Sequence, residues 1–411
     1  MKWYTLCMLA RIPAIGVEMF GKFFLILYIL VQILVSVLTE KSISSSRKFS
    51  GIGKKSRAVR IVIYAALAAV PALGAFLPKS PFKFFCMKAG NIWLGFFMFY
   101  GSFVLLLTIA YWIIAKVRKE DFKASHGRAF QIAFAAALVI FVAGLIHAQQ
   151  PKLVTYDIEL ANEAARGRNL KIVLLADLHL SVNSDIKATE KMVELANGCD
   201  PDVIVIAGDV FTSNYDGLKD PEKYSAAMSK MHAKYGVYAV CGNHDVDENL
   251  FGGFSVSPLS EAFRIPEMDK FFDDSGFNVL YDESVELGDG LFTLVGRVDG
   301  EKAGDGTANR LSPQELLKDT DKTKPVIVLQ HEPIEFEGLA KSGADMVLCG
   351  HTHNGQIFPG NIVVPFFNEN GYGVKDLYGM KTVVTAGVGY YGPPMRFGTD
   401  SEVTLINVTF K

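Results

Sequence analysis

Acidic residues are almost absent from the first third of this 411-residue chain: residues 1–150 hold 4 Asp and Glu against 18 Lys and Arg. Residues 151–411 hold 39 against 23, so the net charge of -2 conceals a basic N-terminal part (+14) and an acidic C-terminal part (-16). Five cysteines exclude a disulfide-stapled mini-protein, and a 50% hydrophobic content excludes a disordered chain. The charge of -16 also argues against nucleic-acid binding, because it repels phosphate backbones.

Charged residues of either sign are missing from four long stretches of the N-terminal part, namely 23–39, 61–78, 89–115 and 129–151. A helix needs about 17–25 apolar residues to cross the hydrocarbon of a bilayer. We therefore expect a transmembrane anchor over 1–150, with spans at about 23–39, 61–78, 91–114 and 129–149. A cleaved signal peptide is disfavoured, because the N-terminus lacks a compact charged start and a small-x-small cleavage site.

Basic residues are divided unevenly between the expected loops. Loops 40–60 and 116–128 together hold twelve Lys and Arg, whereas the opposite side holds seven. The positive-inside rule then predicts a multi-pass cell-membrane protein with its C-terminal domain outside the cytoplasm.

The C-terminal part changes from long apolar stretches to short ones. Apolar, often β-branched runs occur at 171–176, 203–207, 237–240, 291–295, 326–329, 346–348, 383–385 and 403–408. Helical patterns lie between them at about 186–198, 221–234, 259–275 and 313–318. The alternation predicts an α/β domain over 171–411 with buried strands and helices on the faces of the sheet. The polar stretch 151–170 is predicted to be a linker.

Five of the six histidines in this domain follow the apolar runs directly, together with carboxylates and an amide. The residues at these ends are Asp177, His179, Asp209, Asn243, His244, Asp245, His331, His351 and His353. One histidine at a strand end is usually structural. Polar groups that converge from five strand ends would instead repel one another or lack partners, and so they indicate a metal site.

These motifs, in their order Asp-Leu-His, Gly-Asp, Gly-Asn-His-Asp, His and Gly-His-Thr-His, resemble those of the calcineurin-like metallophosphoesterase superfamily. The resemblance covers roughly 170–411. The stretch 386–398 further resembles the membrane-associated bacterial branch related to UDP-2,3-diacylglucosamine hydrolases. Such a resemblance implies a four-layer αββα sandwich that carries two metal ions. Asn354 departs from the pattern, because glycine is commoner there, and this puts the shape of its loop in question.

The resemblance also implies roles for individual residues. One metal would be held by Asp177, His179 and His353 and the other by Asn243, His331 and His351, with Asp209 bridging. Imidazole, carboxylate and amide ligands without thiolate favour Mn, Fe or Zn. His244 would stabilise developing charge or protonate the leaving oxygen, with Asp245 orienting its ring.

Arg396 and the insert 246–275 are candidates for substrate binding. Arg396 is available to bind a phosphate, alongside Asn243, although an arginine that simply covers the sheet edge is nearly as good an interpretation. Aromatic residues in the insert 246–275 either form a lipid-facing lip or pack beneath a cap.

Two other patterns in this domain do not predict a functional site. Cys241 and Cys349, which directly precede two of the motifs, either tune the metal site or are small buried core residues, and the second interpretation is favoured. Cys199 is an odd third, and no disulfide framework is indicated. Residues 387–392 match the spacing G-x-G-x-x-G, but Pro393 and Pro394 follow where a dinucleotide-binding fold requires a helix.

The sequence thus predicts a membrane-anchored, dinuclear metal-dependent hydrolase of a phosphomonoester, phosphodiester or pyrophosphate. Its substrate would be a phosphorylated small molecule or a lipid-linked compound in the bilayer. One alternative is a membrane sensor or transporter with a regulatory metal-binding domain, which would need polar residues within the spans; only Gln32, Gln131 and His147 qualify. A second alternative, a nuclease, is disfavoured by the domain's charge.

Overall fold

The computed structural model describes residues 14–44, 54–119, 127–213, 215–251, 254–255 and 257–411. It divides into two compact units. The first comprises the N-terminal helices up to Leu145 together with two short segments, Asn249–Pro258 and Gly392–Pro394, and the second comprises the rest of the chain from Ile146.

Four long helices make up most of the first unit: α2 (Ala14–Ser44), α3 (Lys54–Phe76), α4 (Pro81–Arg118) and α5 (Gly127–Ala148). Each contains a stretch that is long and apolar enough to cross a membrane, and these stretches overlap the four spans expected from the sequence. Helix α3 continues through Pro71. The basic loop segments 45–53 and 120–126 lie outside the described residues.

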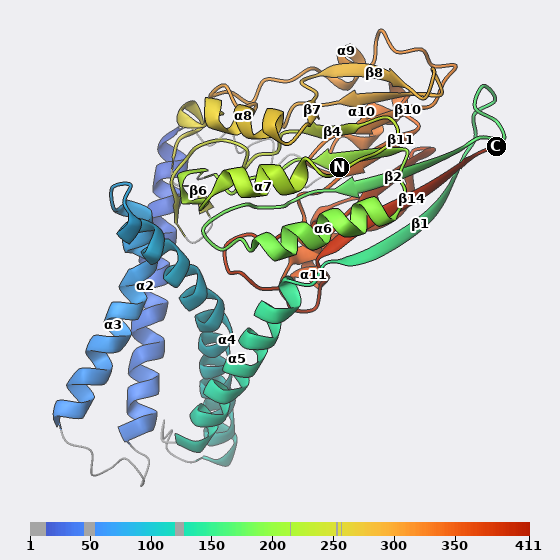
Figure 1. The fold of residues 1–411 in the computed structure, drawn as a ribbon. Coiled ribbons are helices and arrows are strands. Elements are labelled where there is room, and N and C mark those ends of the chain that lie inside the picture. The colour runs from blue at the N-terminus through green and yellow to red at the C-terminus, as the bar shows by residue number, and fades with distance from the viewer. Residues whose placement is uncertain (1–13, 45–53, 120–126, 214, 252–253, 256) are drawn as a thin grey trace. The chain divides into compact units, whose positions relative to one another are not determined.

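The second unit is built around two six-stranded sheets (Figure 1). The first has the order β1 (Lys152–Leu160), β14 (Glu402–Phe410), β2 (Asn169–Leu175), β3 (Val203–Ala207), β4 (Val237–Val240) and β7 (Asn278–Val279). The second has the order β12 (Gly373–Leu377), β13 (Met380–Val384), β11 (Met346–Cys349), β10 (Val326–Leu329), β9 (Phe292–Gly296) and β8 (Glu283–Leu287).

Helices cover the outer face of each sheet, and the central core joins the two sheets. Leu174 and Val205 of the first sheet belong to the same buried cluster as Leu294 and Leu348 of the second. The outer helices of the first sheet are α6 (Ile186–Gly198), α7 (Pro221–Met228) and α8 (Pro266–Asp274). Those of the second are α9 (Pro313–Leu316) and α10 (Phe336–Lys341). The domain is therefore the four-layer αββα sandwich that the resemblance implied.

Short helical elements of the second unit lie in the connections between strands. The short helix α11 (Gly360–Phe367) follows η3 (His353–Gly355), and its residues are all at least partly exposed. The 3₁₀ turns η1 (Tyr215–Gly217) and η2 (Leu259–Glu261) lie in loops.

The prediction of a linker over 151–170 was wrong for its first half. Strand β1 pairs in parallel with β14 over nine residues, from Lys152 with Glu402 to Leu160 with Phe410. It lies at the edge of its sheet, where mainly Ile158 and Leu160 are buried. An edge strand keeps polar side chains on its solvent face, and for this reason the segment resembles a linker in composition.

The insert after the Gly-Asn-His-Asp motif forms a small hairpin, β5 (Leu250–Phe251) with β6 (Phe254–Ser255). Gly252, Gly253 and Val256 lie outside the described residues. This hairpin is part of the first unit, in which β5 lies against α3.

Candidate metal centre

The polar residues singled out in the sequence all lie in loops that follow strands, and the fold brings these loops together. Asp177 follows β2, Asp209 follows β3 and Asn243 follows β4 in the first sheet, whereas His331 follows β10 and His351 follows β11 in the second. The carboxyl ends of parallel strands meet at one edge, where ligands of α/β sheets bind.

The backbone at these positions is unusual. Asp177, His179, Asp209, His351 and His353 all have φ between +47° and +74°, a region that residues other than glycine rarely adopt. Such conformations cost free energy and gather at functional sites. The glycine-rich stretch 387–392 approaches them closely, because a Cβ placed on Gly387 would lie 2.6 Å from Cβ of Asp177. This contact explains a glycine at 387 without any dinucleotide.

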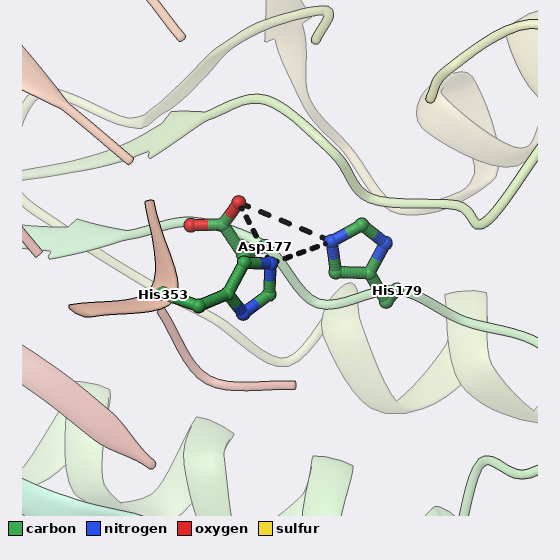
Figure 2. A group of neighbouring side chains, drawn as sticks. All are labelled: Asp177, His179 and His353. Carbon is green, nitrogen blue, oxygen red and sulfur yellow. Dashed lines mark hydrogen bonds and ion pairs between the residues drawn. The ribbon is translucent and has the colours of Figure 1, made fainter. Parts of the chain in front are cut away.

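One group of potential ligands consists of Asp177, His179 and His353, whose side chains point toward one another (Figure 2). The Nε2 atoms of the two histidines are 2.9 Å apart, and Nε2 of His353 lies 3.5 Å from Oδ1 of Asp177. All three residues are buried.

The second group centres on His331, which is fully buried. Its Nδ1 lies 2.8 Å from the carbonyl oxygen of Ala207, so Nδ1 donates a hydrogen bond there and Nε2 faces the site. Three groups surround this Nε2, namely Oδ1 of Asn243 at 3.0 Å, Oδ2 of Asp209 at 3.1 Å and Nδ1 of His351 at 3.2 Å. Asp209 also lies 3.6 Å from Nε2 of His179 and so stands between the two groups.

This arrangement brings together lone pairs and carboxylates in a buried space, which is unfavourable unless positive charge is present. Burial raises the pKa of the Asp177 carboxyl to about 7. Burial alone would lower the pKa of His331, but Asp209 outweighs it and the pKa lies well above its usual value. Divalent cations would supply the missing charge, and the donor set of imidazole, carboxylate and amide fits Mn, Fe or Zn.

His244 lies beside the two groups. Its ring centroid is 5.5 Å from that of His179 and 4.4 Å from that of Tyr391. Burial lowers the pKa of His244 well below its usual value, so the ring is neutral at pH 7.

Asp245 does not orient this ring, contrary to the sequence-based expectation. Its two carboxylate oxygens accept hydrogen bonds from the backbone N–H groups of Phe211 (2.9 Å) and Gly242 (2.8 Å). Asp245 therefore fixes the loops after β3 and β4 to each other, which the sequence spacing alone does not reveal.

A serine occupies the position beside His244 instead. Oγ of Ser213 lies 2.8 Å from Nδ1 of His244 and 3.2 Å from Oε1 of Glu248, to which it donates. Glu248 is in turn paired with Lys302. Since the serine proton goes to the carboxylate, His244 Nδ1–H donates to the serine oxygen and Nε2 is left to face substrate. No sequence pattern marked Ser213 or Glu248.

Arg396 is not available to a phosphate, so that prediction was wrong. The side chain is fully buried, and its guanidinium donates to the carbonyl oxygens of Ala386 (2.6 Å), Gly389 (2.7 Å) and Asp400 (2.8 Å). Nη2 also lies 3.3 Å from Nδ1 of His353. Burial lowers the pKa of Arg396 to about 10, which leaves it charged. It binds the 386–400 loop together and supports a potential ligand.

The same loop places Tyr391 over the site. The Tyr391 ring lies 5.2 Å from that of His179, and Gln356 holds its backbone by accepting from the N–H (2.7 Å) and donating to the carbonyl (2.9 Å). Sequence reasoning pointed to this loop but not to this residue, because a tyrosine among glycines and prolines has no distinctive spacing.

Cys199 and Cys349 are small core residues, whereas Cys241 is only partly buried. Cys199 and Cys349 are buried in apolar clusters, and the four described cysteines are free thiols. Burial raises the pKa of Cys241 to about 12, so its thiol is protonated at neutral pH.

Comparison with known proteins agrees with the geometry. A family model described as calcineurin-like phosphoesterase matches residues 170–355. An uncharacterized metallophosphoesterase of Aquifex aeolicus is 30% identical over 260 residues, which are 62% of this chain and 91% of that protein. A transmembrane protein with metallophosphoesterase domain from Bos taurus is 30% identical over 67% of this chain and 61% of its own length, so the chain spans less than two thirds of that relative.

A third relative has a named activity. The UDP-2,3-diacylglucosamine pyrophosphatase LpxG of Chlamydia trachomatis is 25% identical over 231 residues, which are 48% of this chain and 68% of that protein. The residues matched by the family model, 170–355, include the strand-end motifs described above. The chain therefore belongs to the calcineurin-like metallophosphoesterase family.

Proposed function

We propose that this protein is a membrane-anchored phosphoesterase with two divalent metal ions, acting on a lipid-linked phosphomonoester, phosphodiester or pyrophosphate. The observation that carries the proposal is that two groups of potential ligands meet at Asp209, where divalent cations would stabilise the buried carboxylates and the lone pairs that face them. One ion would be held by Asp177, His179 and His353 and the other by Asn243, His331 and His351, with Asp209 between them.

When bound, two such ions neutralise phosphate charge and lower the pKa of water for in-line attack. The residues of this chain do the remaining work. Ala207 fixes the tautomer of His331, and Asp245 holds the two loops that carry Asp209 and Asn243. Nε2 of His244 faces the substrate. Once this nitrogen has taken up a proton from solvent it would donate that proton to the leaving oxygen, and the carboxylate of Glu248, acting through Ser213, would stabilise the protonated ring.

Membrane anchoring is supported by the four long apolar helices and by the transmembrane relatives. The excess of basic residues in loops 40–60 and 116–128 supports a catalytic domain outside the cytoplasm. A lipid-linked substrate is supported by the anchor, since it confines enzyme and substrate to one surface, and by the named substrate of the Chlamydia relative.

A substrate panel tests this proposal. The full-length protein in nanodiscs would be assayed with Mn²⁺ on UDP-2,3-diacylglucosamine, on a polyisoprenyl diphosphate and on p-nitrophenyl phosphate. We expect at least one lipid-linked compound to be hydrolysed with a higher kcat/KM than the soluble ester. Equal or lower efficiency on every lipid-linked compound would refute the lipid-linked substrate, while metal-dependent hydrolysis of the soluble ester would leave the phosphoesterase intact.

A further inference from the structure

Helix α11 exposes a continuous set of large apolar side chains on the second unit. The exposed fractions are 53% for Ile362, 44% for Val363, 79% for Phe366 and 76% for Phe367, and Phe358 just before the helix is 49% exposed. Positions 362, 363, 366 and 367 fall on one side of a helix. These five residues are here called the α11 apolar face.

Such a surface is unfavourable in water. Burying one large apolar side chain is worth about 1.5–3 kcal/mol, and contiguous exposed patches usually mark contact with a protein or a membrane. Residues 358–368 contain no charged side chain, so the face offers no electrostatic guide to a charged partner. Whatever covers it is apolar.

The contacts of α11 within its unit indicate what covers the α11 apolar face. The segment Phe397–Asp400 is bonded to the residues that precede α11: Phe358 N–H donates to the carbonyl of Phe397 (2.7 Å), and Thr399 Oγ1 donates to the carbonyl of Gln356 (2.7 Å).

The same segment is bonded to the last turn of α5, where the second unit begins. Nε2 of His147 lies 3.2 Å from the carbonyl oxygen of Thr399 and 2.7 Å from Oδ1 of Asp400. Asp400 also pairs with Lys152 at 2.8 Å, at the start of β1. One four-residue segment thus holds both α11 and the end of a candidate span, Ala129–Ala148, in the second unit.

We propose that α11 is an interfacial helix whose apolar face lies in the headgroup and acyl boundary of the membrane that α5 enters. A helix with an apolar face binds there by burying it about 5–10 Å into the boundary. Only three residues separate α5 from β1, and they reach about 10 Å, so β1 begins close to the end of this candidate span.

A short stretch of chain connects α11 to the candidate metal centre. His353 begins the turn η3 that precedes α11, and Gln356 holds Tyr391 by two hydrogen bonds. An α11 embedded in lipid therefore holds the Tyr391 loop in place relative to the bilayer surface.

Depth-dependent fluorescence tests the proposal. The full-length Phe367→Cys variant would be labelled with NBD and placed in nanodiscs with and without nitroxide-labelled lipids. The matched control is Tyr378→Cys, which is 53% exposed in the turn between β12 and β13. Label on the chain's own cysteines is measured on the unsubstituted protein and subtracted.

We expect blue-shifted emission and at least about twofold quenching by shallow nitroxide lipids at position 367, and neither at position 378. Water-like emission at 367 would overturn the proposal. Blue-shifted emission without lipid quenching would also overturn it, because a protein surface would then cover the face. Neither readout depends on catalysis, so the result stands apart from the proposed function.

Discussion

At the scale of single residues, His244 is oriented by a serine and a distant glutamate and not by its neighbour in the chain. Both carboxylate oxygens of Asp245 accept hydrogen bonds from backbone N–H groups, whereas Ser213 connects His244 to Glu248. The ring is thereby held in one tautomer by a carboxylate that it does not touch.

Replacing His244 with Ala should abolish turnover and leave the metal content nearly intact, because His244 contributes no ligand. Metal analysis by mass spectrometry, together with a p-nitrophenyl phosphate assay, checks this. Loss of both metals in the variant would contradict the role given to His244.

The Ser213→Ala and Glu248→Gln variants should lower kcat by about 10- to 100-fold, because orienting a general acid is worth part of the roughly 10²–10⁴ that general acid–base catalysis supplies. Metal content should be unchanged. The basic limb of the pH–rate profile should move to lower pH, because the protonated His244 ring loses the Glu248 charge that stabilises it. Ser225→Ala is the matched control, since Ser225 is also buried but only bonds the backbone of Glu222. Rates equal to the control would show that the serine does not position His244.

Arg396→Met should reduce stability and not substrate affinity. The variant leaves several buried carbonyl oxygens without donors, so the free energy of unfolding should fall by about 2–4 kcal/mol. Thermal unfolding in detergent measures this, with Arg396→Lys as the charge-retaining comparison. A raised KM for p-nitrophenyl phosphate with an unchanged unfolding temperature would restore the phosphate-binding role.

Much of the candidate metal centre could be predicted from sequence, because potential ligands such as Asp177 and His331 follow buried apolar strands whose pattern is plain. Ser213, Glu248 and Tyr391 could not, since their importance comes from loops that meet only after folding. Arg396 was misjudged for a related reason: the sequence shows its charge but not the carbonyl oxygens that enclose it.

At the scale of elements, the edge strand β1 was mistaken for a linker while the buried strands were found. Val203–Ala207 and Val326–Leu329 are apolar throughout and match the predicted runs. In β1, polar and charged residues are interspersed with apolar ones, and its pairing with β14 is evident only from the folded structure. Helix α11 was missed as well, because a helix of eight residues containing Pro365 has little helical signal.

The status of β1 as a strand can be tested by Ile158→Ala. Ile158 is buried in the core between the sheets, so the substitution should lower the free energy of unfolding by about 2–4 kcal/mol. Thr155→Ala on the same strand is exposed and should change it by less than about 0.5 kcal/mol. Equal, small effects in chemical unfolding would indicate that the segment is a linker after all.

For α11, the double variant Phe366→Ser/Phe367→Ser should raise KM for a substrate presented in lipid vesicles by about tenfold or more. Hydrolysis of p-nitrophenyl phosphate should stay within twofold, because neither residue touches the ligand groups. An equal loss of activity on both substrates would show that α11 stabilises the fold of the domain and does not promote binding of substrate at the lipid surface.

At the scale of the whole molecule, the uneven charge of the sequence is divided between two kinds of structure. The basic part forms long apolar helices, and the acidic part forms the αββα domain. Composition and the length of apolar runs were enough to predict this division. They could not predict that Asn249–Pro258 and Gly392–Pro394 belong with the helices, because such membership depends on contacts distant in sequence.

The predicted topology can be measured with reporters fused after Lys411 in a bacterial host. Alkaline phosphatase should be active there and green fluorescent protein dark, because the positive-inside bias puts the C-terminus outside the cytoplasm. The opposite pair of signals would place the catalytic domain in the cytoplasm.

The decisive measurement is metal stoichiometry and turnover on the same preparations of the full-length protein and of its Asp209→Ala variant. Both would be assayed on p-nitrophenyl phosphate and bis-p-nitrophenyl phosphate, with Mn²⁺ and with chelator. We predict two metal ions per chain and chelator-sensitive hydrolysis in the wild type, with fewer ions and no turnover in the variant. Bound metal without hydrolysis in the wild type, or full activity in the variant, would contradict the assignment of a dinuclear phosphoesterase.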